Sequence, residues 1–186
     1  MTDRVLVEIV AGGVIVGGIL WEYNSFVRLA ARANNAWSDI DVQLRRRYDL
    51  VPNLVATVKQ YAAHESDTFE EVARQRTAAQ QAEQVGKRED AENALETGLR
   101  SVFALAEAYP ELRAADNFRD LQRQLVEIED DLQHARRYYN AVVRDLNTKL
   151  ESFPVGMLGR LGGIREREFF QIDKEVREAH VSASFQ

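Results

Sequence analysis

Apolar and small residues recur every three or four positions along most of this chain. Between Arg32 and Glu65 they are Ala33, Trp37, Ile40, Leu44, Tyr48, Val51, Val55, Val58 and Ala62. A second set is Leu95, Leu99, Val102, Leu105, Ala106 and Tyr109. The third and most regular set is Phe118, Leu121, Leu125, Ile128, Leu132, Ala135, Tyr139, Val142, Leu146 and Leu150. The charged residues between its members predict a solvated face: Arg119, Asp120, Arg123, Glu127, Glu129, Asp130, Asp131, Arg136 and Arg137. Such spacing aligns apolar side chains on one side of a helix, so it predicts long helices that pack against one another.

Pro52 falls inside the first of these patterns. It has no backbone N–H, and it disfavours helical backbone at the residue before it. Two interpretations fit: a new helix capped near Asp49, with Pro52 in its first turn, or one long helix that bends. Because the apolar pattern keeps its phase across Pro52, we favour a kink or a very short break. We expect this segment to continue through Phe69, Val72 and Arg76 to a turn at Gly86.

The remaining helix ends are predicted from prolines and capping residues. A second helix should begin near Glu89 and end at Pro110, because proline cannot continue a helix that precedes it. A short connection follows, and Asp116 or Asn117 is the expected N-cap of the last helix. Phe153-Pro154 should close that helix. Supercoiled packing within one chain is expected, and self-association is the alternative.

The segment Val5–Trp21 differs from all of these because it is apolar on every side. Its sequence is VLVEIVAGGVIVGGILW, in which Glu8 is the only charged residue. About 17 helical residues span roughly 25 Å, somewhat less than a hydrocarbon core of about 30 Å. Trp21 and Tyr23 follow at one end, where interfacial aromatic residues occur. Its four glycines are costly in a buried core helix and better tolerated in a membrane helix, so the segment predicts a transmembrane helix.

We expect this helix to be retained as an anchor. A cleaved signal peptide is the alternative, but Arg4 is the only basic residue before the apolar run, and no small-residue cleavage site follows the run. Arg28, Arg32 and the run Arg45-Arg46-Arg47 come after it. The positive-inside rule then predicts a cytoplasmic bundle and an N-terminus on the other side, with an external bundle as the alternative.

The predicted fold class is therefore all-α, an N-terminal transmembrane helix followed by a long antiparallel bundle of three to four helices. We divide the chain into an anchor at residues 1–25, a bundle at 26–155, and a glycine-containing C-terminal segment with a polar tail at 156–186. Glycines and apolar residues alternate just after Pro154. We expect this part to pack on the bundle end, and contact with the membrane interface is the alternative.

Charge and composition narrow the possible chemistry. A net charge of −6 argues against a nucleic-acid groove, which needs a basic surface. Zero cysteines exclude disulfides, thiolate metal sites and lipid attachment through cysteine. We find no strand followed by a glycine-rich phosphate loop. We therefore expect no enzyme, no cofactor and no small-molecule substrate.

Two histidines suggest metal sites that the spacing does not complete. His64-Glu65 lacks the second histidine of a zinc-protease helix. Asp131 and His134 have the spacing of a carboxylate–histidine pair in di-metal bundles, but such sites need two pairs. Surface positions are the preferred interpretation for Asp131 and His134. We assign no catalytic, cofactor-binding or metal-binding residue.

A belt of charged residues on the first helix contains Asp39, Asp41 and Arg45–Arg47. Asp41 and Arg45 can pair across one helical turn. Contact with an acidic partner or with lipid headgroups is the functional interpretation, and ion pairing inside the bundle is the one we prefer. Four asparagines lie beside the apolar patterns and are expected to form hydrogen bonds between helices: Asn35, Asn53, Asn140 and Asn147.

Two blocks of sequence resemble the LemA family of bacterial membrane-anchored proteins. They are AWSDIDVQLRRRYDLVPNLVATVKQYAAHE at residues 36–65 and YPELRAADNFRDLQRQLVEIEDDLQHARRYYNAVV at residues 109–143. The resemblance implies an N-terminal span, a helical bundle and a location in the bacterial inner membrane. It implies no agreed reaction. We expect a non-enzymatic membrane-anchored scaffold or interaction module, with lipid and protein partners. The alternatives are membrane remodelling or envelope assembly and, less favoured, a carboxylate-bridged metal enzyme.

Overall fold

The computed structural model describes residues 2–171 and contains only helices and connections within that range. The helices are α1 (Thr2–Lys59), α2 (Ser66–Gln81), α3 (Val85–Ala108), α4 (Pro110–Ala114), α5 (Asp116–Glu151) and α6 (Val155–Leu161). The predicted all-α class, with a long apolar N-terminal helix and a helical bundle, is confirmed. The predicted polar tail lies outside the described residues.

The chain forms two compact units. Among the described residues, the first combines residues 2–38 with residues 138–168, and the second combines residues 39–137 with residues 169–171. Helices α1 and α5 therefore each contribute to both units. The division into segments 1–25, 26–155 and 156–186 stays a prediction.

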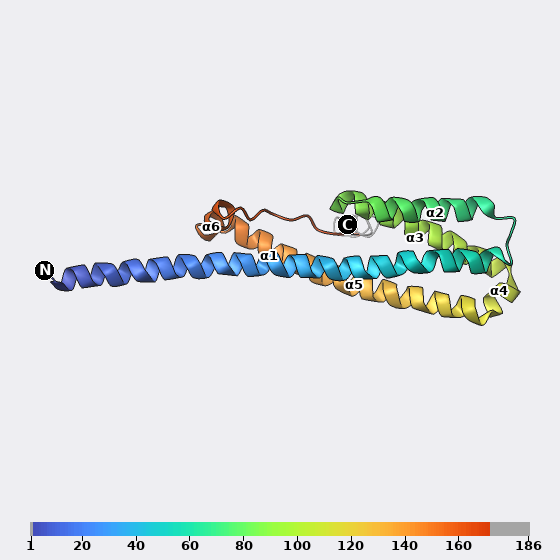
Figure 1. The fold of residues 1–186 in the computed structure, drawn as a ribbon, viewed down its shortest axis with the longest axis horizontal. Helices are drawn as coiled ribbons and strands as arrows, with labels where there is room; N and C mark the ends of the chain where they lie inside the picture. Colours follow the sequence, from blue (N-terminus) through green and yellow to red (C-terminus); the bar gives the residue numbers. More distant parts are fainter. Residues whose placement is uncertain (1, 172–186) are drawn as a thin grey trace, which may run out of the picture. The chain divides into compact units, whose positions relative to one another are not determined.

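The second unit is an antiparallel bundle. Its parts of α1 and α5 and the helices α2 and α3 follow one another in alternating directions (Figure 1). Its buried apolar side chains include Ile40, Leu44, Leu54, Val58, Phe69, Val72, Leu95, Val102, Leu112 and Leu132. Gly98 allows α2 and α3 to approach closely, since a Cβ there would lie 2.1 Å from Oε1 of Gln75. The apolar patterns thus become the bundle core, as predicted.

Two predicted boundaries on this stretch are wrong. The first segment does not continue to Gly86, because α1 ends at Lys59 and the chain reverses before α2 begins at Ser66. The reversal lets Phe69 and Val72 bury their side chains in the bundle. Ala62 and Phe69 are also one heptad apart, so the apolar spacing continues across the reversal and hides it. Gly86 lies within the first turn of α3, and the connection precedes it.

Helix α1 runs through Pro52 without a break, so the interpretation as one long helix is confirmed, and a new helix capped near Asp49 or a short break is wrong. A bend at Pro52 stays a prediction. A helical residue at position 52 would normally donate its N–H to the carbonyl of Tyr48, four residues earlier, and proline leaves that carbonyl without its donor. In the structure, Nε of Arg76 on α2 donates to this oxygen at 2.6 Å. A side chain from the neighbouring helix thus replaces the hydrogen bond that Pro52 removes.

The other helix ends agree more closely with expectation. Helix α3 begins at Val85, one turn before the predicted start, and Tyr109 caps its end, just before Pro110. The expected connection at residues 111–117 contains the short helix α4. Asp116 and Asn117 both lie inside α5, so the prediction that one of them is its N-cap is wrong. Helix α5 closes just before Phe153-Pro154, as predicted.

The first unit packs α6 against α1 and α5. Its buried core is Phe26, Leu146 and Leu150, with Leu29, Val155 and Ile164 against them. Trp37 of α1 also meets Tyr139 of α5, with ring centroids 5.3 Å apart. Beyond α6 the chain is held by Asn147, which donates to the carbonyl of Arg167 at 2.9 Å and accepts from its N–H at 3.0 Å. The described C-terminal segment therefore packs on the helices, as preferred.

Candidate functional site

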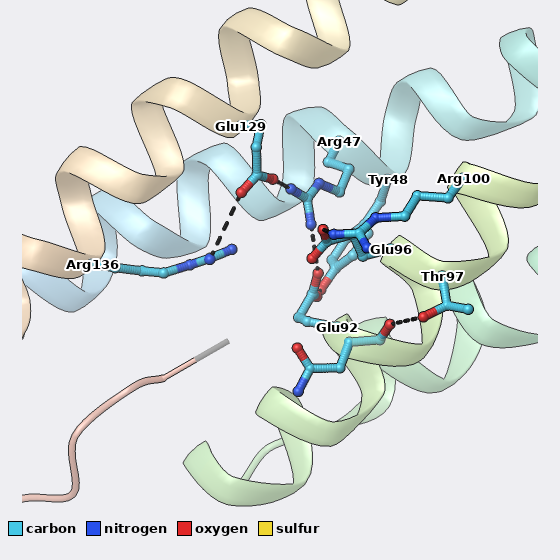
Figure 2. Close-up of polar contacts among 9 residues, drawn as sticks. Arg47, Tyr48, Glu92, Glu96, Thr97, Arg100, Glu129 and Arg136 are labelled. Atoms are coloured by element: carbon cyan, nitrogen blue, oxygen red, sulfur yellow. Dashed lines mark hydrogen bonds and ion pairs between the residues drawn. The ribbon is translucent and has the colours of Figure 1, made fainter. Parts of the chain in front are cut away.

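The most unusual feature of the second unit is a cluster of charged side chains inside the bundle. Arg47 is 3% exposed and Glu92 is 0% exposed. Tyr48, Glu129 and Arg136 lie beside them (Figure 2). We call these five residues the buried charge cluster. Charged groups are rarely buried without partners, so the contacts within this cluster decide its meaning.

Three helices supply the cluster. Arg47 and Tyr48 come from α1, Glu92 from the first part of α3, and Glu129 and Arg136 from α5 (Figure 2). Each position continues an apolar face of its helix. Glu92 lies three residues before buried Leu95. Arg136 follows Leu132 by four residues and precedes Tyr139 by three. The helical periodicity therefore turns these charged side chains inward.

The contacts form a chain from α3 through α1 to α5. Arg47 donates to Glu92 at 3.3 Å through Nη1, and its Nη2 pairs with Glu129. The hydroxyl of Tyr48 donates to the other oxygen of Glu92. Arg136 lies 3.8 Å from Glu129, and its guanidinium sits over the ring of Phe170 at 5.7 Å from the centroid. One arginine thus links carboxylates from two other helices.

Burial raises the pKa of Glu92 above its usual value, because the bundle interior disfavours the charged form. The hydroxyl of Tyr48 and the guanidinium groups of Arg47, Arg136 and Arg88 oppose this rise. Burial also raises the pKa of Tyr48, and the charge of Glu92 raises it further. Tyr48 is therefore held in its neutral form, as a hydrogen-bond donor.

A raised carboxyl pKa beside a tyrosine also occurs in acid–base catalysis. Here the geometry opposes that role, since Glu92 is completely covered. A surface depression beside Tyr48 has a volume of about 380 Å³ and is lined by Asp41, Arg45, Tyr48, Asp49, Gln80 and Arg88. Glu92 does not line it. The contacts instead favour a role in fixing the register of the three helices.

Most of the predicted belt on α1 pairs with residues of the bundle itself, as preferred. Asp41 contacts Arg45 at 2.7 Å and Arg88 of α3 at 3.0 Å. Arg46 lies 3.7 Å from Asp131 of α5. Asp39 is exposed. The structure therefore distributes the belt around the helix, and its buried member is Arg47.

His64, Asp131 and His134 are exposed, which confirms the surface interpretation of Asp131 and His134. His64 is exposed in the connection between α1 and α2, and Glu65 precedes α2. Nδ1 of His134 lies 2.8 Å from Nη2 of Arg137, while Asp131 faces Arg46. Within residues 2–171, the structure brings together no group of three or more His, Asp or Glu side chains suited to a metal ion.

The four asparagines differ in their surroundings. Asn147 forms hydrogen bonds, but not to another helix as expected: both its amide atoms hold the backbone of Arg167, which lies in the non-helical segment after α6. Asn140 is half-buried, whereas Asn35 and Asn53 are exposed on α1. Glu92 was not predicted as a site residue, and the expectation that Glu129 and Arg136 lie on a solvated face is wrong, because Arg136 is 8% exposed and pairs with Glu129. Extending the spacing of Leu95 back by three residues would have found Glu92.

The apolar N-terminal part of α1 is the second candidate site. Large side chains from Val5 to Trp21 are exposed in the structure. Helix α1 contains a window long and apolar enough to cross a membrane, and none of that window is buried. Together with the bundle, it defines the class of the molecule, a helical-bundle protein with one candidate membrane helix.

The chain belongs to the LemA family, whose model matches residues 36–185. It is similar to Magnetosome protein MamQ 1 and MamQ 2 of Paramagnetospirillum magneticum, with 25% identity over 84% of this chain and 67% of each relative. It is also 25% identical to Magnetosome protein MamQ of Magnetospirillum gryphiswaldense, over 82% of this chain and 65% of that protein. None of these names denotes an enzyme. Family membership and the exposed apolar helix support a membrane-associated protein of the LemA type.

Proposed function

We propose that this protein is a single-pass membrane protein whose helical bundle acts as a non-enzymatic scaffold or interaction module. The observation that carries the proposal is the contrast along α1, which is apolar and exposed before Trp21 and packed beyond Phe26. An exposed apolar segment as long as this one needs apolar surroundings, and the hydrocarbon core of a bilayer supplies them. The bundle then presents a charged helical surface beside the membrane.

The proposed location is the bacterial inner membrane, with the N-terminus outside and the bundle in the cytoplasm. This orientation rests on basic residues. Arg28 and Arg32 follow the span closely, whereas Arg4 precedes it. The proposed partners are the lipid bilayer, a second copy of the chain, or proteins of a membrane-organising assembly. The relatives are named as magnetosome proteins, and the proposal of a protein of a membrane-organising assembly draws on that name.

Affinity capture from membranes tests the scaffold. The full chain and a control that carries only the apolar span would be expressed at equal levels and isolated after mild crosslinking. We expect defined partners that the full chain retains and the span alone loses, because the bundle should supply the contacts. Identical sets of captured proteins from both would contradict the proposal. A reporter fused after Gln186 tests the orientation, and it should be active on the cytoplasmic side.

A further inference from the structure

Helix α6 and the turn before it carry apolar side chains that nothing in the first unit covers. Phe153 is 85% exposed, Met157 57% and Leu161 83%. They are spaced by four residues, so Met157 and Leu161 lie one turn apart on α6. We call these three residues the α6 apolar edge. Exposed aromatic and aliphatic residues gathered in one short segment indicate a contact surface.

The glycines of the same segment, in contrast to these exposed side chains, are closely packed. A Cβ on Gly156 would lie 2.1 Å from the carbonyl oxygen of Leu150, and a Cβ on Gly159 would lie 2.9 Å from the ring of Phe26. At Gly162 it would lie 2.4 Å from the ring of Tyr23. Gly159 and Gly162 therefore hold this segment tightly against the α1 residues Phe26 and Tyr23, and Gly156 holds it against the end of α5, with the apolar edge exposed.

The position along α1 decides what the apolar edge meets. With a rise of about 1.5 Å per residue, Tyr23 and Phe26 lie roughly 3 and 8 Å beyond Trp21, where the apolar span ends. The polar layer of a bilayer is roughly 5–8 Å thick on each side. The span is also slightly short for the hydrocarbon core, which draws the residues after it toward the interface. Helix α6 thus lies at the level of the headgroups.

We infer that the α6 apolar edge inserts into the membrane interface beside α1, so that the protein touches lipid through two segments far apart in sequence. The inference rests on the proposed membrane anchor. Interfacial segments combine apolar side chains with basic ones. Helix α6 carries the exposed Arg160, whose Nη2 lies 3.5 Å from Oε1 of Glu166. Phe153 can bury its ring among the acyl chains while the charged groups stay in the headgroup layer.

Because the chain contains 0 cysteines, single thiol labels can test this without a background. Met157→Cys and Leu161→Cys would carry an environment-sensitive fluorophore in the full chain, reconstituted in phosphatidylcholine–phosphatidylglycerol vesicles. The matched control is Val126→Cys, because Val126 of α5 is 56% exposed and Met157 is 57% exposed. Ile15→Cys reports on the span. Phospholipids carrying a nitroxide at the headgroup, or deep in the acyl chain, quench by contact.

We expect headgroup or shallow nitroxides to remove most of the emission from positions 157 and 161, and little from position 126. Position 15 should respond to the deep nitroxide. Quenching at 15 without quenching at 157 and 161 would overturn the inference and leave the anchor intact. Absence of quenching at 15 would overturn the anchor itself. A blue-shifted but unquenched label at 157 would indicate a protein surface, such as a second copy, and would also overturn the inference.

Discussion

Proteins usually bury apolar side chains and expose charged ones. The apolar part of α1 and the buried charge cluster each depart from one half of this rule. In the first, aliphatic side chains such as Ile15 and Val16 are exposed. In the second, charged side chains such as Arg47 and Glu92 are enclosed. An exposed apolar surface can only be stabilised by something outside the chain, whereas the cluster finds its partners on α1, α3 and α5. The first region therefore predicts a partner, and the second does not require one.

The two regions also differ in tolerance. Lipid accommodates many apolar side chains, so the span should accept one aliphatic residue for another and reject a charge. The cluster should instead be sensitive to the replacement of a single charged residue by an apolar one. Removing one partner leaves the opposite charge buried, while replacement of several members together by apolar groups can be neutral. The same kind of substitution thus has opposite consequences in the two regions.

The largest expected effect is at the cluster. Arg47→Met should lower the free energy of unfolding by about 3–5 kcal/mol, because Glu92 and Glu129 lose a buried cation. The control is Arg46→Met, since Arg46 is a neighbouring exposed arginine and should cost about 0–1 kcal/mol. Urea unfolding of the full chain in detergent, followed by circular dichroism, measures both. Equal losses would show that the buried contacts add nothing.

A charge in the span should have a slightly smaller effect. Ile15→Arg should weaken membrane insertion by about 2.5–3.5 kcal/mol, because the guanidinium would sit in hydrocarbon. Alkaline extraction of membranes should then release more of this variant than of the parent. Val126→Arg, at an exposed position of α5, is the control and should remain membrane-bound. Unchanged retention of the Ile15 variant would argue against a spanning helix.

Pro52 and Arg76 provide a test within the bundle. Arg76→Leu should cost about 1–3 kcal/mol, because the carbonyl of Tyr48 loses its donor. In a Pro52→Ala background the new backbone N–H at position 52 can donate to that carbonyl. The same arginine substitution should then cost clearly less, and a double-mutant cycle measures the difference. If the two costs are equal, the hydrogen bond from Arg76 does not compensate for Pro52.

The mildest intervention is a change of pH. The pKa of Glu92 is higher in the folded chain than in the unfolded one, so the unfolded chain releases this proton first as pH rises above about 4. The contribution of Glu92 to stability is thus full at lower pH and is lost as pH rises through the folded pKa. As pH rises from about 4 through the folded pKa of Glu92, the parent should lose stability relative to Glu92→Gln. Glu96→Gln, on the same helix, controls for the loss of one carboxylate. Parallel pH curves for parent and Glu92→Gln would contradict the prediction.

The sequence predicted the helical fold because apolar spacing alone places Ile40, Leu44 and Leu132 in a common core. It did not predict the reversal after Lys59, since Ala62 and Phe69 keep the helical spacing across it. Acidic residues near the start of α2, such as Asp67, were a usable sign of a helix start.

The cluster was harder to predict than the fold. A glutamate at an apolar position resembles a surface residue until its partners are known, and the partners of Glu92 come from helices distant in sequence. Arg47 looked like its exposed neighbours Arg45 and Arg46. The exposed edge of α6 was hidden for another reason, because glycine spacing does not show which side of a short helix packs.

The contact between Arg76 and the carbonyl of Tyr48 also constrains the order in which the sequence can evolve. With Arg76 present, position 52 can change from proline to another residue without leaving a polar group unmatched. If Arg76 changed first, the carbonyl would lose its donor while proline remained. We therefore expect LemA homologues that keep this proline to keep a donor at the position of Arg76. Lineages that have lost the proline should vary freely there.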